Sequence, residues 1–174
     1  MKKLLPRYTL IYGSLIALSC FLFFVGLYNL SPNPLGVRRP GIGFNIMFVF
    51  IALAFYRRNN GGYLHFYEGI SIGFLANLLG SVLTGISIYL FVSFYDGTPF
   101  TAWTDAGIKL LYDQKETFDI LLSPENFDRQ VESLRNAKHY QLVLDEIMFK
   151  QFSIIPIALI SMALRRQRPT PPVQ

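Results

Sequence analysis

The segment that decides the fold is Ile70–Phe94, ISIGFLANLLGSVLTGISIYLFVSF, a run of 25 residues without a charged side chain. At about 1.5 Å per residue, a helix of this length crosses a hydrocarbon core of about 30 Å. Every fourth residue from one turn upstream is small or polar: Gly69, Gly73, Asn77, Ser81 and Gly85. Because small residues at this spacing let two helix backbones approach closely, the run predicts both a membrane span and a helix-packing stripe.

Further apolar segments predict an all-α membrane protein with four transmembrane helices, at about 8–30, 41–56, 66–95 and 147–164. The second is short, about 24 Å long, and tolerates little tilt. In the fourth, we expect Lys150 to snorkel to the interface and Pro156 to kink the helix. We interpret residues 1–174 as one membrane domain, with residues 96–146 inserted between the third and fourth spans as a helical extracytoplasmic loop.

The distribution of charge predicts the orientation of these spans. Only 16% of the residues are charged, against about 25% in soluble domains. Lysine and arginine concentrate in three short flanks, which positive-inside reasoning places in the cytoplasm: Lys2, Lys3, Arg7, Arg57, Arg58, Arg165, Arg166 and Arg168. We therefore predict a multi-pass protein of the bacterial inner (cytoplasmic) membrane with both termini cytoplasmic. Membrane topology explains these basic clusters, so we expect the lipid bilayer, and no nucleic acid, as a partner.

The long loop at 96–146 has a different composition, with ten of the chain's eleven acidic residues. Ser123-Pro124-Glu125 predicts a helix start, with an N-cap, proline at the first helical position and an acid in the first turn. Phe127, Val131 and Leu134 then fall on one side of that helix. Two interpretations stay open: amphipathic helices that cap the bundle or lie on the outer leaflet, or a docking surface for a partner.

The order of these features resembles a bacterial membrane-protein family known as domain-of-unknown-function family 4199. The most specific likeness is the entry into the third span, Arg57-Arg58-Asn59-Asn60-Gly61-Gly62-Tyr63-Leu64-His65-Phe66-Tyr67-Glu68-Gly69. The segment from Asp96 to Phe100 is similar to the family's acidic and proline-containing exit from that span. The resemblance extends over nearly the whole chain. It implies a membrane fold but no catalytic residue, because the family has none established.

The sequence contains no recognisable catalytic or cofactor-binding motif. Its two histidines, His65 and His139, are predicted on opposite sides of the membrane, so a zinc site is not expected. No predicted span interior contains Asp, Glu or His, which disfavours intramembrane hydrolysis. We therefore expect no enzyme activity, no metal and no cofactor.

Two polar residues of the third span permit a structural or a functional interpretation. Glu68 is explained by a favourable position at a helix N-terminus or by pairing with Arg57 or Arg58; alternatively, it is an ionisable site for a proton or cation. Asn77 lies deep in the span, where it makes an interhelical hydrogen bond or contacts a solute.

Function follows only in outline from these features. The leading hypothesis is a non-enzymatic interaction or scaffold component of the bacterial envelope, with a membrane-protein partner or a second copy of itself. The alternative is an oligomeric transporter or channel subunit for a small solute or ion, although inverted repeats and charged midplane groups are not evident. A lipid-modifying enzyme is the weakest hypothesis.

Overall fold

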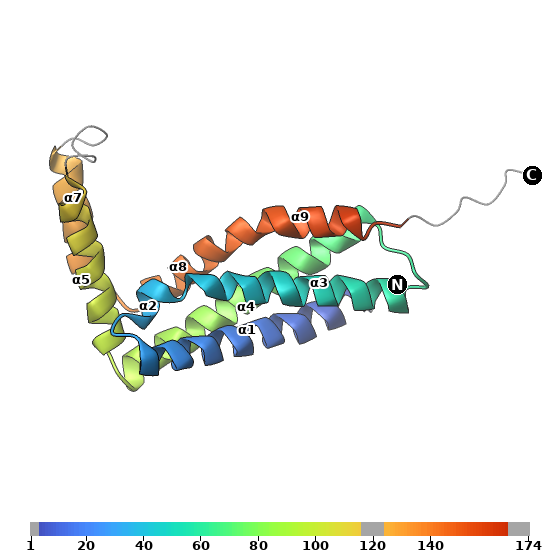
Figure 1. Ribbon diagram of the computed structural model, residues 1–174, viewed down its shortest axis with the longest axis horizontal. Helices are drawn as coiled ribbons and strands as arrows, with labels where there is room; N and C mark the ends of the chain where they lie inside the picture. The colour runs from blue at the N-terminus through green and yellow to red at the C-terminus, as the bar shows by residue number, and fades with distance from the viewer. Residues whose placement is uncertain (1–3, 116–123, 167–174) are drawn as a thin grey trace, which may run out of the picture.

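The computed structural model describes residues 4–115 and 124–166 of the chain, and the described part is helical apart from turns and one isolated β-bridge between Leu64 and Arg166. Four long segments form a bundle (Figure 1): α1 (Leu4–Leu30), α3 (Ile42–Asn59), α4 (Phe66–Phe94), and a last segment made of α8 (Gln141–Lys150), the short 3₁₀ helix η2 (Gln151–Ser153) and α9 (Ile154–Ala163). The all-α prediction is confirmed.

Within residues 4–115 and 124–166, three helical segments are long and apolar enough to cross a membrane, namely Leu5–Leu30, Arg39–Asn59 and Phe66–Phe94. The predicted fourth span differs, because it is not one continuous helix. Its two α-helical pieces have ten residues each and are joined by η2. Pro156 lies just beyond this join and has no N–H to donate to the preceding turn, which is consistent with the expected irregularity. The last segment also starts earlier than predicted, at Gln141 instead of about 147.

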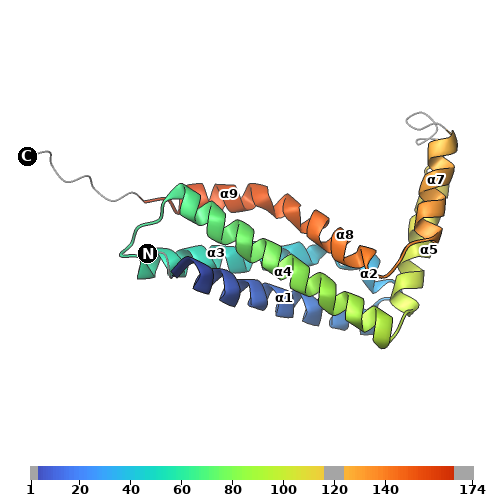
Figure 2. The same ribbon diagram turned by 180° about the vertical axis from the view of Figure 1, so that it is seen from behind.

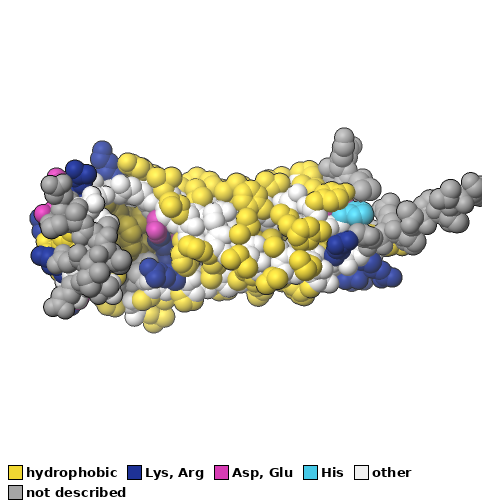
Figure 3. Space-filling view, turned by 90° about the horizontal axis from the view of Figure 1, so that it is seen from above, with side chains coloured by type: hydrophobic (Ala, Val, Ile, Leu, Met, Phe, Trp, Pro, Cys, Tyr) yellow, Lys and Arg dark blue, Asp and Glu magenta, His cyan; other side chains and the backbone are white. Residues whose placement is uncertain are grey.

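Helix α4 is the central element of the bundle, as Figure 2 shows from behind: it lies between α1 on one side and α8 and α9 on the other. Its glycines make this close packing possible. A Cβ on Gly80 would lie 2.5 Å from Cγ2 of Ile16 in α1, and one on Gly85 would lie 2.9 Å from the Cα of Val143 in α8. Hydrophobic side chains cover much of the bundle surface seen in Figure 3, and charged side chains gather toward its two ends.

The segment between α4 and α8 forms a helical hairpin that stands across one end of the bundle (Figure 1). Its helices are α5 (Thr98–Asp113) and α7 (Pro124–Arg135). Phe100 anchors the hairpin in a buried cluster with Phe24, Leu35 and Leu142. The predicted helix of the loop is present from Pro124 onward, while its predicted N-cap, Ser123, lies outside the described residues.

Two short elements close the same end of the bundle. Helix α2 (Pro34–Val37) and the 3₁₀ helix η1 (Arg39–Gly41) connect α1 to α3. The side chain of Asn33 caps α2 by accepting a 3.0 Å hydrogen bond from the backbone N–H of Gly36. This compact connection fixes Arg38 above the ends of the long helices, where it faces α8.

Candidate functional site

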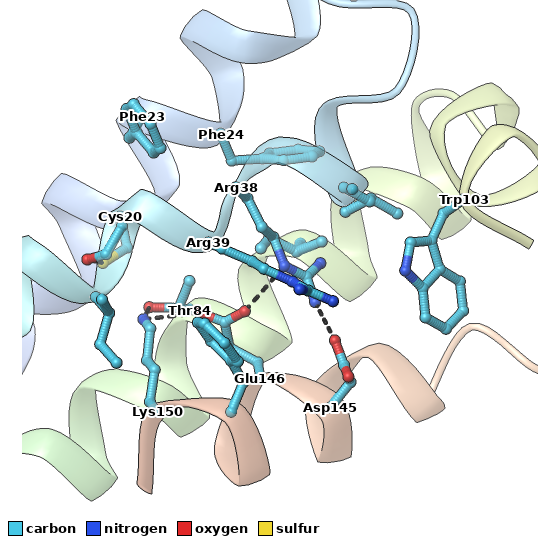
Figure 4. Close-up of a pocket in the computed structure, with 16 residues that line it drawn as sticks. Cys20, Phe23, Phe24, Arg38, Arg39, Thr84, Trp103, Asp145, Glu146 and Lys150 are labelled. Carbon is cyan, nitrogen blue, oxygen red and sulfur yellow. Dashed lines mark hydrogen bonds and ion pairs between the residues drawn. The ribbon is translucent and has the colours of Figure 1, made fainter. Parts of the chain in front are cut away.

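A cluster of charged side chains lies inside the bundle at the hairpin end (Figure 4). Glu146 on α8 binds two cations: its Oε1 lies 2.8 Å from Nζ of Lys150, and its Oε2 lies 3.1 Å from Nε of Arg38. The side chains of Arg38, Glu146 and Lys150 are only 10%, 6% and 2% exposed. Arg38 also contacts the half-exposed Asp145, at 2.6 Å from Nη2 to Oδ2.

Local helix geometry explains half of this arrangement. Glu146 and Lys150 are four residues apart on α8, so both project from the same helix face, toward α4. There Nζ of Lys150 donates a 3.1 Å hydrogen bond to Oγ1 of Thr84, whose hydroxyl donates to the carbonyl of Gly80 at 2.6 Å. A buried charge left without a partner is costly, so each ion here depends on its neighbour.

The prediction that Lys150 snorkels to the interface is wrong. The ammonium turns into the bundle because a carboxylate and a hydroxyl satisfy it there. The predicted last span began at about residue 147 and so left out Glu146, which is buried in the bundle because α8 begins five residues before it, at Gln141. The Glu–x₃–Lys spacing beside an apolar run was the sequence signal for this pair.

The charged cluster borders a pocket of about 150 Å³. Its walls combine the charged groups with apolar and aromatic side chains from α1, α2, α4, α5 and α8: Phe23, Phe24, Leu35, Ile88, Trp103 and Phe149. Within the part of the chain that the structure describes, Nη1 of Arg38 is buried and has no hydrogen-bond partner. Arg39 also lines the pocket, with its guanidinium carbon 5.9 Å from the centre of the Phe149 ring.

A layer of amide groups lies below the charged cluster, toward the middle of the bundle. Asn45 on α3 donates a 2.6 Å hydrogen bond to Asn77 on α4, and Asn77 donates to the backbone carbonyl of Lys150 at 3.1 Å. The Ser153 hydroxyl donates to the same carbonyl at 2.6 Å. These side chains therefore satisfy the backbone where α8 gives way to η2. Sequence reasoning singled out Asn77 but missed Asn45, which lies near the start of the second predicted span.

Below the amide layer, the interior becomes apolar. Five side chains with 0% exposure fill the space between α3, α4 and α9: Val49, Leu53, Ile72, Ala76 and Ile157. Among the described residues, this apolar layer separates the amide groups from Glu68 at the other end of α4. The polar interior thus reaches from the hairpin end to about the middle of the bundle and stops there.

The predicted packing stripe of α4 is buried along its whole length. A Cβ on Gly69 would lie 2.8 Å from Oγ of Ser161 on α9, and one on Gly73 would lie 2.6 Å from Cγ2 of Ile157. Gly85 faces α8, and Ser81 donates to the carbonyl of Asn77 at 2.7 Å. The stripe is therefore in contact with the last segment of the chain, and its Asn77 belongs to the amide layer.

Glu68 lies at the opposite end of the bundle and is buried. Its carboxylate accepts hydrogen bonds from the hydroxyl of Tyr56, at 3.1 Å, and from the backbone N–H of His65, at 3.0 Å. The second bond closes a capping box at the start of α4. Within the described residues, neither Arg57 nor Arg58 forms an ion pair with it, so the helix-cap geometry explains its position.

Comparison with known proteins gives a family but no function. Residues 11–166 match the model of the family described as "Protein of unknown function (DUF4199)". No curated protein and no solved structure matches the chain. The family match extends from the first helix to the end of the last segment and includes Arg38, Asn45, Asn77, Glu146 and Lys150. The chain therefore belongs to the DUF4199 family, as the entry into its third span indicated.

Proposed function

We propose that this protein is a non-enzymatic binding component of the bacterial envelope, which recognises a ligand or partner through the charged pocket at its hairpin end. The observation that carries the proposal is the buried Arg38–Glu146–Lys150 cluster beside an open pocket. Ionisable groups inside a membrane bundle are expensive to keep, and they commonly mark functional sites. We propose no reaction, because both carboxylate oxygens of Glu146 already bind cations and the Cys20 thiol, which also lines the pocket, donates to Asn45 at 3.4 Å.

The proposal includes a topology with four spans in the inner membrane and the α5–α7 hairpin outside the cytoplasm. The broken segment α8–η2–α9 is the fourth span, and neighbouring side chains satisfy the backbone where it is interrupted. Arg57, Arg58, Arg165 and Arg166 all lie at the end of the bundle that also holds the start of α1 (Figure 1). Their excess of positive charge supports cytoplasmic termini and an extracytoplasmic pocket.

The apolar layer below Asn77 favours binding over conduction. A channel needs a continuous polar path, and here the described interior is closed by Val49, Leu53 and Ile157. A transporter subunit is the second candidate, favoured by a different observation. Transporter binding sites typically contain an interrupted helix, near the middle of the bundle, with a backbone carbonyl that lacks a partner within the helix and binds a polar group. The Lys150 carbonyl, which accepts a hydrogen bond from Asn77, has this arrangement.

Two experiments test this proposal. Cys20 is the only cysteine and is buried, so in a Cys20→Ser background we expect an impermeant maleimide to label Lys138→Cys from outside intact spheroplasts, and Arg165→Cys only after lysis. The reverse pattern would overturn the topology. In proteoliposomes, we expect ion and solute fluxes equal to those of protein-free vesicles. A flux that Lys150→Met abolishes would establish the transporter instead.

A further inference from the structure

We propose that the pocket binds a small monocarboxylate, with its carboxylate between Arg38 and Arg39 and its apolar part against Trp103 and Phe149. This inference rests on the proposed binding function and names the ligand class for that pocket. It is argued from the charge, the free hydrogen-bond donors and the size of the site.

The charge of the lining favours an anion with a single negative charge. Three cations, Arg38, Arg39 and Lys150, face two carboxylates, Asp145 and Glu146. Both oxygens of Glu146 already bind cations, and among the described residues Arg39 has no ion pair. The pocket therefore carries one uncompensated positive charge in surroundings that are partly apolar, where an anion is held more strongly than in water.

The free hydrogen-bonding groups are donors. Nε and Nη2 of Arg38 are occupied by Glu146 and Asp145, whereas Nη1 is buried without a partner in the described part of the chain. A buried donor of a charged group that lacks an acceptor is costly. A carboxylate supplies only acceptors, so it matches this unsatisfied guanidinium. Arg39 has an exposed side chain and lines the same pocket, so it offers the ligand a second guanidinium.

The size and lining limit the rest of the ligand. A volume of about 150 Å³ resembles that of engineered cavities that hold benzene, so a molecule of about six non-hydrogen atoms fits. The aromatic rings of Trp103 (Figure 4) and of Phe149, which also lines the pocket, suit an apolar substituent better than a second charge. Inorganic phosphate leaves these rings without a contact, and a phospholipid head group with its glycerol exceeds the volume.

The test uses the full chain in detergent and isobutyrate as the probe. Trp103 is the only tryptophan of the chain and lines the pocket, so its fluorescence reports occupancy directly. We expect a saturable fluorescence change with isobutyrate and none with isobutyramide, which has nearly the same shape but no charge. We expect Arg39→Gln to weaken the affinity at least tenfold, whereas Arg58→Gln, at the opposite end of the bundle, leaves it unchanged.

Isobutyramide, inorganic phosphate and nanodiscs that contain phosphatidylglycerol are each titrated in the same way. An equal response to isobutyramide, no response to isobutyrate, or an Arg39→Gln affinity equal to that of the wild type would overturn the proposal. A response only to inorganic phosphate, or only to nanodiscs that contain phosphatidylglycerol, would replace the carboxylate with a phosphate group and leave the proposed binding function standing. The proposed binding function is tested separately: a flux in proteoliposomes that Lys150→Met abolishes would overturn it.

Discussion

Glu146 holds two cations inside the bundle, and its neighbour Asp145 holds one of the same cations near the surface. The two carboxylates allow a matched comparison of buried and exposed ion pairing. We predict that Glu146→Gln lowers the free energy of unfolding by about 3–5 kcal/mol, because Lys150 is then a buried charge without a counter-ion. The side chain of Asp145 is 48% exposed, so Asp145→Asn should lower the free energy of unfolding by less than about 1 kcal/mol.

Thermal unfolding in detergent measures both variants. The double variant Glu146→Gln/Lys150→Met removes the stranded charge together with its partner, so it should recover most of the lost stability. Equal melting temperatures for Glu146→Gln and Asp145→Asn would show that the interior pair does not stabilise the bundle.

Asp96, just after α4, gives a prediction about pH. Hydrogen bonds from the hydroxyl and backbone N–H of Thr98, and then from the Tyr28 hydroxyl, lower the pKa of this carboxyl below 3.8. A carboxyl with a lowered pKa in the folded state stabilises the protein above its unfolded pKa, and this contribution is lost as pH falls through the folded value. The melting-temperature difference between wild type and Asp96→Asn should therefore shrink from pH 5 to pH 3. A difference that stays constant over this range would contradict the assignment.

At the scale of helices, the close approach of α4 to the backbone of α8 depends on Gly85. A Cβ there meets the Cα of Val143 at 2.9 Å, and a backbone atom cannot turn aside as a side chain does. We predict that Gly85→Ala destabilises the bundle by about 1–3 kcal/mol through overpacking. Gly26 in α1 is the control, since a Cβ there meets nothing within 4 Å. Gly26→Ala should be neutral or stabilising, by at most about 1 kcal/mol, and thermal unfolding compares the two.

The positions of the four apolar segments could be predicted from the sequence because they depend on local chemistry. Charge-free runs require helices in a membrane, and the prolines at 32 and 34 follow the end of α1 at Leu30. The last segment was predicted less well. At η2, Asn77 and Ser153 donate hydrogen bonds to the Lys150 carbonyl. Asn77 lies 73 positions away in the sequence, so no local sequence pattern predicts this contact.

The candidate site was largely hidden from the sequence for the same reason. Arg38 and Asp145 are 107 positions apart, and either residue alone is typical of a solvated loop. The capping role of Glu68 could be predicted from the sequence, since it depends only on the position of Glu68 in the first turn of one helix. The charged pocket could not be predicted in this way, because it forms only where the α1–α3 connection, α4 and α8 come together in the fold.

For the whole molecule, the position of the hairpin depends on few side chains. Phe100 is 7% exposed in the buried cluster below α5, and its ring packs edge-on against His139, with centroids 4.6 Å apart. We predict that Phe100→Ala costs about 3–5 kcal/mol and releases the hairpin, so that protease cuts within helix α5 faster. Phe94 is 82% exposed, and Phe94→Ala should leave both the melting temperature and the cleavage rate nearly unchanged. Unaltered proteolysis of the Phe100 variant would mean that other contacts hold the hairpin.

The shared charges of Arg38, Glu146 and Lys150 also have a consequence for biosynthesis. Helix α4 is long and apolar enough to cross a bilayer by itself, whereas the last segment carries two acids and a lysine whose partners on Arg38 and Thr84 are made much earlier. At the centre of a lipid-exposed helix, each such charge opposes insertion by about 2.5–3.5 kcal/mol. In the four-span topology proposed above, we expect the nascent chain to keep its first three helices assembled beside the translocon until the final segment emerges, so that insertion and folding finish as one event.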